Sequence, residues 1–253
     1  MAAQKYVFSI KDLEEDEELG EKVNQLIKLR KAQFLIPDSF VIKSLAYFDF
    51  LKGNRLEKKI KHLLGTVDFK KAKSIKETAI HINKHLAGSD IPNEILKEIL
   101  NAYKKLGGIL EHAHVNIFFS HILKENSSHI VRGDAALLDR IKTNWAMIYS
   151  PSTPKVNPTS IIQKVLNGKK GKIKTSTKQI KTSSDLSKKE TENLEDMVKK
   201  FKKEFYMPYE IDWAIDKDKV YVLKIRPETN FGGKSLIFPE THYQIYKNSH
   251  NLL

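Results

Sequence analysis

The chain contains no cysteine among its 253 residues. Disulfide bonds, zinc–thiolate sites and thiol catalysis are therefore excluded for these residues. The sequence also lacks an apolar run long enough to span a bilayer. Its first 20 residues, MAAQKYVFSIKDLEEDEELG, hold an acidic run and no apolar signal core. We therefore expect a cytoplasmic protein that does not bind membranes.

Glycine is scarce: the chain has 11, and none lies between Gly108 and Gly133. A phosphate cradle made of backbone N–H groups needs glycine-rich turns, so none is expected in that interval. No Walker loop and no Gly-x-Ser-x-Gly elbow occurs anywhere in the sequence. The close histidines His81 and His85 lack a His-Glu-x-x-His pattern, and we interpret them as structural or surface residues.

Acidic residues are outnumbered, because 31 aspartates and glutamates face 44 lysines and arginines, which gives a net charge of +13. This balance favours partners that carry phosphate, namely nucleotides, nucleic acid or anionic lipid, without choosing among them. Seven lysines and no acid lie between Lys164 and Lys181. Such a run is typical of a solvated face, but it also suits non-specific binding of a nucleic-acid backbone that weakens as salt rises.

Helical patterns dominate the first hundred residues, and strand and helix patterns mix afterwards. This order predicts an α+β fold with two lobes, helix-rich in its first half and built on a mixed sheet in its second. We expect a first lobe over 1–110 and a second lobe over 111–230, which carries a basic insert at 152–186 and a C-terminal hairpin. Residues 231–253 form the expected tail.

Polar residues at the starts of helical patterns predict where several helices begin. Ser187 followed by Glu190, and Ser74 followed by Glu77, have the spacing of a capping box. Asp134 is expected to cap the helix that follows it.

A charged hairpin is predicted between Tyr209 and Thr229, where two strand-like runs flank a charged turn. Strand alternation gives the first run a polar face with Glu210 and Asp212. The opposite face of that strand is apolar, with Ile211, Trp213 and Ile215.

The return strand adds two cations to the polar face. Simple alternation places four residues together on that strand: Val220, Val222, Lys224 and Arg226. If Asp212 pairs with Lys224, then Glu210 pairs with Arg226, and four charges form one compact patch. The plainest interpretation is two cross-strand ion pairs on a solvent-facing sheet, each worth about a few tenths of a kcal/mol.

The hairpin resembles the end of the ATP-binding domain of phosphoenolpyruvate synthases and pyruvate phosphate dikinases, which has an ATP-grasp fold. That family has Asp-Ile-Glu-Trp, a turn, and Leu-Gln-x-Arg-Pro-x-Thr. This chain has EIDW at 210–213 and LKIRPET at 223–229. Further segments are similar to family segments in the same order: LGEKVNQL at 19–26, FLIPDSFVI at 34–42, AYFDFL at 46–51 and VRGDAALLDRIKTNWAMIYSP at 131–151.

The resemblance implies a site for ATP with five binding residues: Lys22, Glu210, Asp212, Lys224 and Arg226. Lys22 stands at the position of the family's phosphate-contacting lysine, and Asp212 is implied as a ligand of Mg²⁺. Arg226 is the implied catalytic residue, because a planar guanidinium suits phosphate and stabilises the charge that develops during transfer. This interpretation requires Lys22 and Arg226 to face one cleft from two lobes.

Departures from the family pattern weaken the expected catalysis. Lys224 stands where the family has a metal-binding glutamine, and an ammonium group cannot ligate Mg²⁺, so it either repels the ion or replaces its charge. Phe118 stands where a second phosphate-contacting arginine is expected. The family's glycine-rich loop is replaced by LKENSSH at 123–129, and part of the family domain is missing between Pro151 and Leu186.

The resemblance thus implies a shortened, stand-alone ATP-binding domain related to ATP-dependent phosphotransferases, with weak or no catalysis. ATP is the expected cofactor, with Mg²⁺ if Asp212 still binds it. The phosphohistidine and pyruvate-binding domains of the family are absent from the sequence, so a separate phosphohistidine-domain protein is the expected partner for any transfer. The alternative is a basic adaptor that keeps the fold as a scaffold. It would bind nucleic acid through residues 164–181, or an acidic protein.

Overall fold

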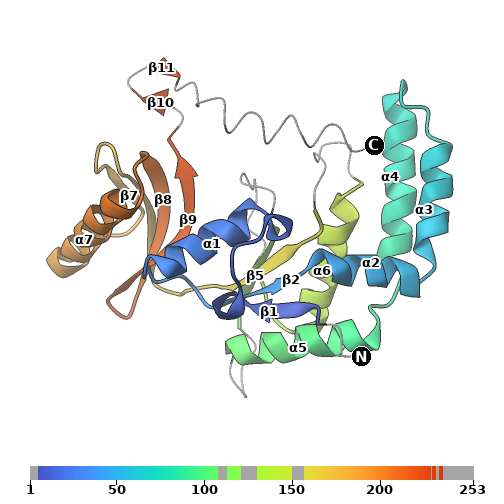
Figure 1. Ribbon diagram of the computed structural model, residues 1–253, viewed down its shortest axis with the longest axis horizontal. Helices are drawn as coiled ribbons and strands as arrows, with labels where there is room; N and C mark the ends of the chain where they lie inside the picture. Colours follow the sequence, from blue (N-terminus) through green and yellow to red (C-terminus); the bar gives the residue numbers. More distant parts are fainter. Residues whose placement is uncertain are drawn as a thin grey trace.

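The computed structural model describes residues 5–107, 113–120, 130–149 and 157–228, together with the backbone of 230–231 and 234–235. Two antiparallel sheets lie on either side of helix α1 (Glu21–Lys31), and most of the other helices gather around the larger sheet (Figure 1). The α+β fold class predicted from the sequence is confirmed. In the part of the chain that the structure describes, no helix is both long and apolar enough to cross a membrane.

The first sheet has five strands in the order β1-β2-β5-β3-β4. Their bounds are β1 Val7–Ser9, β2 Ser39–Ile42, β3 Val115–Phe119, β4 Ile130–Val131 and β5 Ser160–Lys164. β5 lies between β2 and β3, so a strand from the expected basic insert occupies the middle of this sheet. The sheet therefore takes strands from both sides of residue 110.

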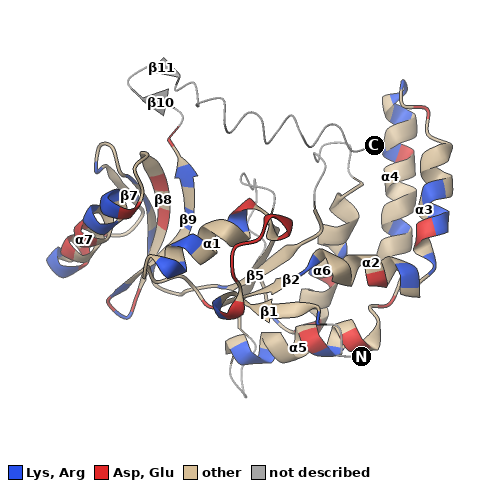
Figure 2. Cartoon of the chain, in the orientation of Figure 1, with Lys and Arg blue, Asp and Glu red and all other residues tan. Residues whose placement is uncertain are grey.

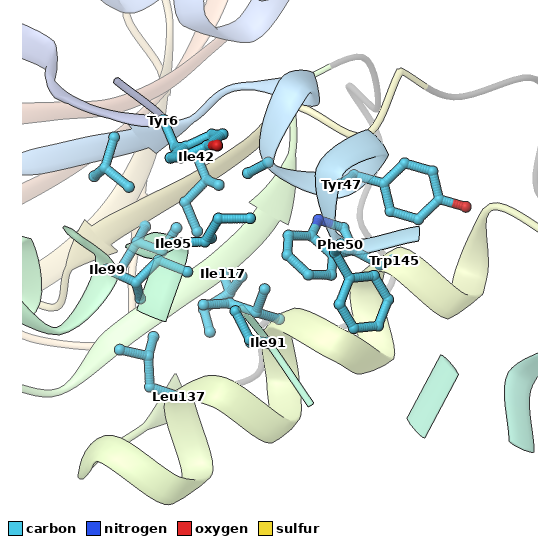
Figure 3. Close-up of a cluster of buried hydrophobic side chains, with 14 of the residues drawn as sticks. Tyr6, Ile42, Tyr47, Phe50, Ile91, Ile95, Ile99, Ile117, Leu137 and Trp145 are labelled. Carbon is cyan, nitrogen blue, oxygen red and sulfur yellow. The ribbon is translucent and has the colours of Figure 1, made fainter. Parts of the chain in front are cut away.

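Five helices supply the apolar cover of one face of this sheet: α2 (Ser44–Gly53), α3 (Leu56–Gly65), α4 (Ala72–Ala87), α5 (Asn93–Gly107) and α6 (Asp134–Met147). Phe50 and Trp145 are fully buried there, with ring centroids 5.1 Å apart (Figure 3). Because strand side chains alternate, Phe40 and Ile42 of β2 enter this cluster, whereas Val41 enters a second cluster on the opposite face.

The second sheet has four strands in the order β7-β6-β8-β9. Their bounds are β6 Lys169–Lys174, β7 Ile180–Thr182, β8 Tyr209–Asp216 and β9 Lys219–Pro227, and a two-stranded ribbon of β10 (Asn230–Phe231) and β11 (Lys234–Ser235) follows. Helix α7 (Lys188–Glu204) packs Leu194 and Phe201 into the same cluster as Trp213 of β8. One face of this sheet is therefore apolar.

Helix α1 joins the two sheets through this second cluster. Val23, Ile27 and Leu29 of α1 are fully buried in it, together with residues of both sheets. Two short 3₁₀ helices, η1 (Ile10–Asp12) and η2 (Glu17–Leu19), precede α1. After α1 the chain meets the edge of the second sheet, where the backbone N–H of Val222 donates to the carbonyl of Leu35 at 2.8 Å.

Of the three predicted helix starts, one is confirmed and two are wrong. The capping box of Ser187 and Glu190 at α7 is confirmed, with both reciprocal hydrogen bonds present. The one at Ser74 is wrong, because α4 begins at Ala72 and the Ser74 hydroxyl instead accepts from the N–H of Asp68 at 3.1 Å. Asp134 does not cap α6 either: it is the first residue of that helix, and Gly133 precedes it with φ of 92°.

Candidate nucleotide-binding site

The polar face of the β8–β9 hairpin carries four of the predicted site residues. Glu210 pairs with Arg226 and Asp212 with Lys224, so the predicted register is confirmed. The Arg226 Nη2 donates to Glu210 Oε1 at 2.6 Å and to Asp212 Oδ1 at 2.9 Å. Figure 2 shows the acidic residues on β8 and the basic residues on the neighbouring β9. One guanidinium nitrogen thus links both carboxylates.

A β-bulge corrects the predicted faces of the return strand. The register shifts between Asp212 and Trp213, so that Trp213 opposes Val222 and Leu223 has no opposite residue. The extra residue reverses the alternation, and Val222, which is 1% exposed, packs in the apolar cluster. The prediction that Val222 shares the face of Lys224 and Arg226 is therefore wrong, and Val220, which packs against the same cluster, is wrongly placed for the same reason.

Lys172 of β6 belongs to this polar cluster, and sequence reasoning missed it. Its Nζ lies 3.6 Å from Glu210 Oε1 and 3.9 Å from Asp212 Oδ1. The residue falls in the lysine run at 164–181, which the sequence analysis treats as separate from the hairpin. Its signal was the alternation of KKGKIK, but the pairing of β6 with β8 that brings it to Asp212 is a tertiary fact.

Residues of the lysine run and of the hairpin share one face of the second sheet, which we call the basic face. It is defined by Lys170, Lys172 and Lys174 of β6, Lys181 of β7, Glu210 and Asp212 of β8, and Lys224 and Arg226 of β9. Lys172 stands directly opposite Lys181 across the two strands. Like charges in that position destabilise a sheet. Six cations against two acids make this face a ready site for a phosphate-bearing ligand.

Burial governs the charge state of Asp212. Desolvation raises the pKa of its carboxyl above the ordinary value, and this effect exceeds the opposing attraction of Arg226, Lys172 and Lys224. The negative charge of Glu210 also acts to raise this pKa. The ionised carboxylate is thus held in place by cations although its surroundings disfavour the charge.

Lys22 lies at the start of α1, on the first sheet, and is 5% exposed. Its Nζ stands 3.2 Å from the ring centroid of Phe118 on β3, a cation–π contact. The Phe118 ring therefore lies directly against the lysine ammonium.

The first N–H groups of α1 are already used within the protein. The N–H of Lys22 donates to the carbonyl of Ser120 at 3.0 Å, and that of Val23 donates to the Ser120 hydroxyl at 3.2 Å. Gly20 precedes the helix with φ of 80°, a conformation that L side chains rarely adopt. The N-terminus of this helix therefore does not offer those two N–H groups to a phosphate.

Lys22 and Arg226 come from elements that touch, since α1 contacts β9. At the start of β8, burial raises the pKa of Tyr209 and the negative charge of Glu21 adds to the effect. The charge of Glu21, the first residue of α1, therefore acts on the first residue of β8. The contacts described for Lys22 and Arg226 go to different groups, so a cleft shared by the two side chains stays a prediction.

Two hollows are lined by described residues, and none of the five predicted site residues lines either. The larger, of about 570 Å³, lies along β1 and α5 and includes Val7, Phe40 and Glu98. The smaller, of about 210 Å³, lies between α3, α4 and the end of α6. The candidate site, as its described residues define it, is a charged face of the second sheet.

The residues present fit nucleotide phosphate better than they fit Mg²⁺. When phosphates supply the other ligands, Mg²⁺ usually takes one or two carboxylates from the protein, and Glu210 and Asp212 are of that kind. Both already bond to Arg226, with Lys172 within 4 Å of each. Among the described residues, no group of three or more histidines, aspartates or glutamates is placed to hold a metal ion.

Taken together, the two sheets define an ATP-grasp-like α+β domain. Comparison with family models gives a match to the pyruvate phosphate dikinase AMP/ATP-binding domain over residues 16–119 and 152–242. The match spans more than half of the chain, which therefore belongs to this family of ATP-binding domains. The predicted resemblance is confirmed, but its extent differs: the match includes 152–208, which the sequence analysis leaves out, and omits 120–151.

Solved structures give distant likenesses. D-alanine–D-alanine ligase from Bacillus anthracis is 10% identical, with 90% of this chain and 62% of the ligase covered and a TM-score of 0.46. Cdc123 from Schizosaccharomyces pombe is 15% identical, with 90% and 92% covered and a TM-score of 0.45. The ATP-grasp ligase PsnB, complexed with precursor peptide PsnA2 and AMPPNP, is 13% identical, with 83% and 50% covered and a TM-score of 0.41. No curated protein matches the sequence.

Proposed function

We propose that this chain binds ATP with its phosphates on the basic face and that it transfers phosphate slowly or not at all. The observation that carries this proposal is the convergence of three cations, Arg226, Lys172 and Lys224, on the two acids of β8. The acids hold the cations in place, and the cluster keeps one net positive charge for an incoming anion. This arrangement gives a reason for the charges on the hairpin that isolated ion pairs do not.

Arg226 is prepared to receive a phosphate. Its Nη2 is fixed by Glu210 and Asp212, and its other N–H donors make no hydrogen bond within the described residues. A guanidinium has five donors in a planar fork, so one nitrogen anchors the group while the others remain for phosphate oxygens. Prior fixation lowers the ordering cost of binding.

Fixed cations take over part of the role of Mg²⁺ in this proposal. Lys224 and Lys172 supply positive charge near Asp212, so a metal ion is less needed to neutralise the phosphates and is repelled when it approaches. Mg²⁺, when bound, would neutralise charge on the transferred phosphoryl group. On the first sheet, Phe118 stands in place of a second phosphate-contacting arginine. Both replacements favour binding over transfer.

Any phosphate acceptor lies outside these 253 residues under this proposal, and a phosphohistidine domain is the acceptor that the family suggests. The full reaction of a pyruvate phosphate dikinase is not proposed for this chain. Its contribution is the nucleotide half alone, with Lys22 as a second phosphate contact from the first sheet.

Calorimetric titration with ATP, with and without Mg²⁺, tests the proposal. We expect micromolar binding that changes little with Mg²⁺ and that weakens about tenfold or more in Arg226→Ala, since hydrogen bonds to charged groups contribute about 1.5–3 kcal/mol. Lys202→Ala, on the exposed surface of α7, is the matched control and should bind like the parent chain. In Lys224→Gln, metal dependence should increase. Equal binding by Arg226→Ala and the parent would remove the proposed site.

The alternative function, a basic adaptor for nucleic acid, has one observation in its favour: Lys170, Lys172, Lys174 and Lys181 lie on the same sheet face. An electrophoretic shift assay with a single-stranded oligonucleotide at two salt concentrations separates it from ATP binding. The adaptor predicts a shift at low salt that fades at high salt. Absence of any shift at low salt eliminates it.

A further inference from the structure

Helices α3 and α4 stand side by side at the end of the molecule farthest from the four-stranded sheet (Figure 1). Near the turn that joins them, two large apolar side chains are exposed: Leu64 is 39% exposed and Phe69 72%. Both line the hollow of about 210 Å³, together with Val67, Ile75 and Ile148. Scattered exposed apolar residues are ordinary, but two of them beside one apolar hollow indicate a binding surface.

The size of this hollow limits what it can hold. Pockets for small organic ligands usually measure about 300–1,000 Å³. A hollow of about 210 Å³ is smaller and suits one large apolar side chain of a partner. Among the described residues that line it, only Thr78 and Tyr149 carry a polar side-chain group, and the Tyr149 hydroxyl already bonds to that of Tyr47.

The turn that presents Phe69 is held by a small hydrogen-bond network. The Asp68 N–H donates to the Ser74 hydroxyl at 3.1 Å, and Asp68 Oδ1 accepts the Lys70 N–H at 3.0 Å. The Lys71 ammonium lies 3.1 Å from Asp68 Oδ2. Phe69 is therefore displayed by an ordered turn, which lowers the cost of ordering it on binding.

The two helices beside the hollow are rich in positive charge. Residues 55–88 contain nine lysines and arginines against three acids, and Figure 2 shows the positions of basic residues along both helices in blue. In the part of the chain that the structure describes, six of these lysines form no ion pair: Lys58, Lys59, Lys61, Lys70, Lys76 and Lys84. The pKa of His85 is lowered by burial and then by the positive charges of Lys59, His81 and Lys84.

We propose that this α3–α4 surface, defined by Leu64, Phe69 and the lysines that surround them, binds an acidic amphipathic helix of another protein. Charge complementarity selects the acidic partner, and the hollow selects an apolar anchor residue on it. Nucleic acid would use the lysines but leave the hollow empty. An anionic membrane would use the lysines and Phe69 but needs no hollow. The proposal does not depend on nucleotide binding, because no predicted nucleotide residue lies on this surface.

Fluorescence anisotropy with the full chain provides the test. The probe is a labelled amphipathic peptide that carries Leu and Phe at helix positions i, i+3, i+4 and i+7 and Glu elsewhere. A peptide of the same composition in scrambled order and one with every Glu replaced by Lys are the controls. Binding should be saturable with the first peptide, weaken as salt rises, and be absent with the Lys peptide.

Variants locate the contact. Phe69→Ser should weaken binding about tenfold or more, as expected for an anchor side chain. Ile80→Ser, on α4 and 54% exposed but outside the hollow, should leave binding unchanged and serves as the matched control. The double change Lys61→Glu with Lys70→Glu should weaken binding as well, whereas Lys202→Glu on α7 should not. Circular dichroism of each variant checks that it remains folded.

Several outcomes overturn the proposal. They are no binding of the acidic peptide, equal binding of the scrambled peptide, and equal binding by Phe69→Ser and the parent chain. Displacement of the peptide by an oligonucleotide, with oligonucleotide binding that is insensitive to Phe69→Ser, assigns the surface to nucleic acid instead. Binding to phosphatidylserine vesicles but not to the peptide assigns it to a membrane. Loss of ATP binding in Arg226→Ala leaves this proposal unaffected.

Discussion

The five-stranded sheet is apolar on both faces, whereas the four-stranded sheet is apolar on one face and charged on the other. Phe40 and Val41 of β2 enter separate apolar clusters on the two sides of the first sheet. In the second sheet, Trp213 is fully buried while Asp212, the residue before it, faces Arg226 and Lys172. Because the five-stranded sheet is buried on both faces, we interpret it as structural support. We therefore expect the ligand on the charged face of the four-stranded sheet.

The largest change in stability is expected when a buried side chain on the apolar face of the second sheet is truncated. Trp213→Ala should lower the free energy of unfolding by about 3–5 kcal/mol, because it leaves a cavity among α7, β9 and α1. Lys172→Ala, on the opposite face of the same sheet and half exposed, should change it by no more than about 0.5 kcal/mol. Urea unfolding followed by circular dichroism measures both. Equal losses would contradict the two-faced sheet.

A double-mutant cycle tests whether Phe118 positions Lys22. The single changes Lys22→Met and Phe118→Leu remove the ammonium and the ring in turn. We expect a coupling energy of about 0.5–2 kcal/mol in urea unfolding, since the pair is buried. A parallel cycle on Lys200 and Phe34, whose ammonium-to-centroid distance is 4.8 Å, should give a smaller value. If the effects of Lys22→Met and Phe118→Leu were additive within about 0.3 kcal/mol, the cation–π contact would not contribute to stability.

The smallest effect concerns the pH dependence of stability. The raised pKa of Asp212 means that the folded protein binds this proton more tightly than the unfolded chain does. The stability of the parent chain relative to Asp212→Asn should therefore be greatest below the ordinary pKa of Asp, about 3.9, and should fall as pH rises through the folded value. Urea unfolding at a series of pH values checks the direction. A relative stability that rises with pH would reverse the assignment of burial as the dominant cause.

Local patterns in the sequence predict the hairpin, but they do not predict which strand lies beside it in the sheet. The alternation in YEIDWAID predicts the polar face of Glu210 and Asp212, and the assumed pairing of Asp212 with Lys224 correctly gives that of Glu210 with Arg226. The bulge at Leu223 leaves no such mark, because no glycine or other special residue signals it, and so the face of Val222 is predicted wrongly. Lys172 is missed because strand order within a sheet depends on the tertiary fold.

The sequence predicts Phe118 and Lys224 as departures from the family pattern, but it does not predict the contacts that these residues make. That the Phe118 ring lies beneath the Lys22 ammonium depends on the packing of α1 on β3. Likewise, the capping-box spacing at Ser74 and Glu77 is present, but the Ser74 hydroxyl accepts from Asp68 in the preceding turn instead. Local motifs compete with tertiary contacts, and at these positions the tertiary contacts prevail.

Helix α1 is fastened at both ends, to Ser120 beside the first sheet and, through Leu35, to the edge strand β9 of the second. A hinge that opened the sheets like a clamp would have to break one of these attachments or carry the helix as a rigid lever. Any movement that separates the sheets is therefore expected to release one of the two attachments and to carry α1, with Lys22 at its start, along with the sheet that still holds it.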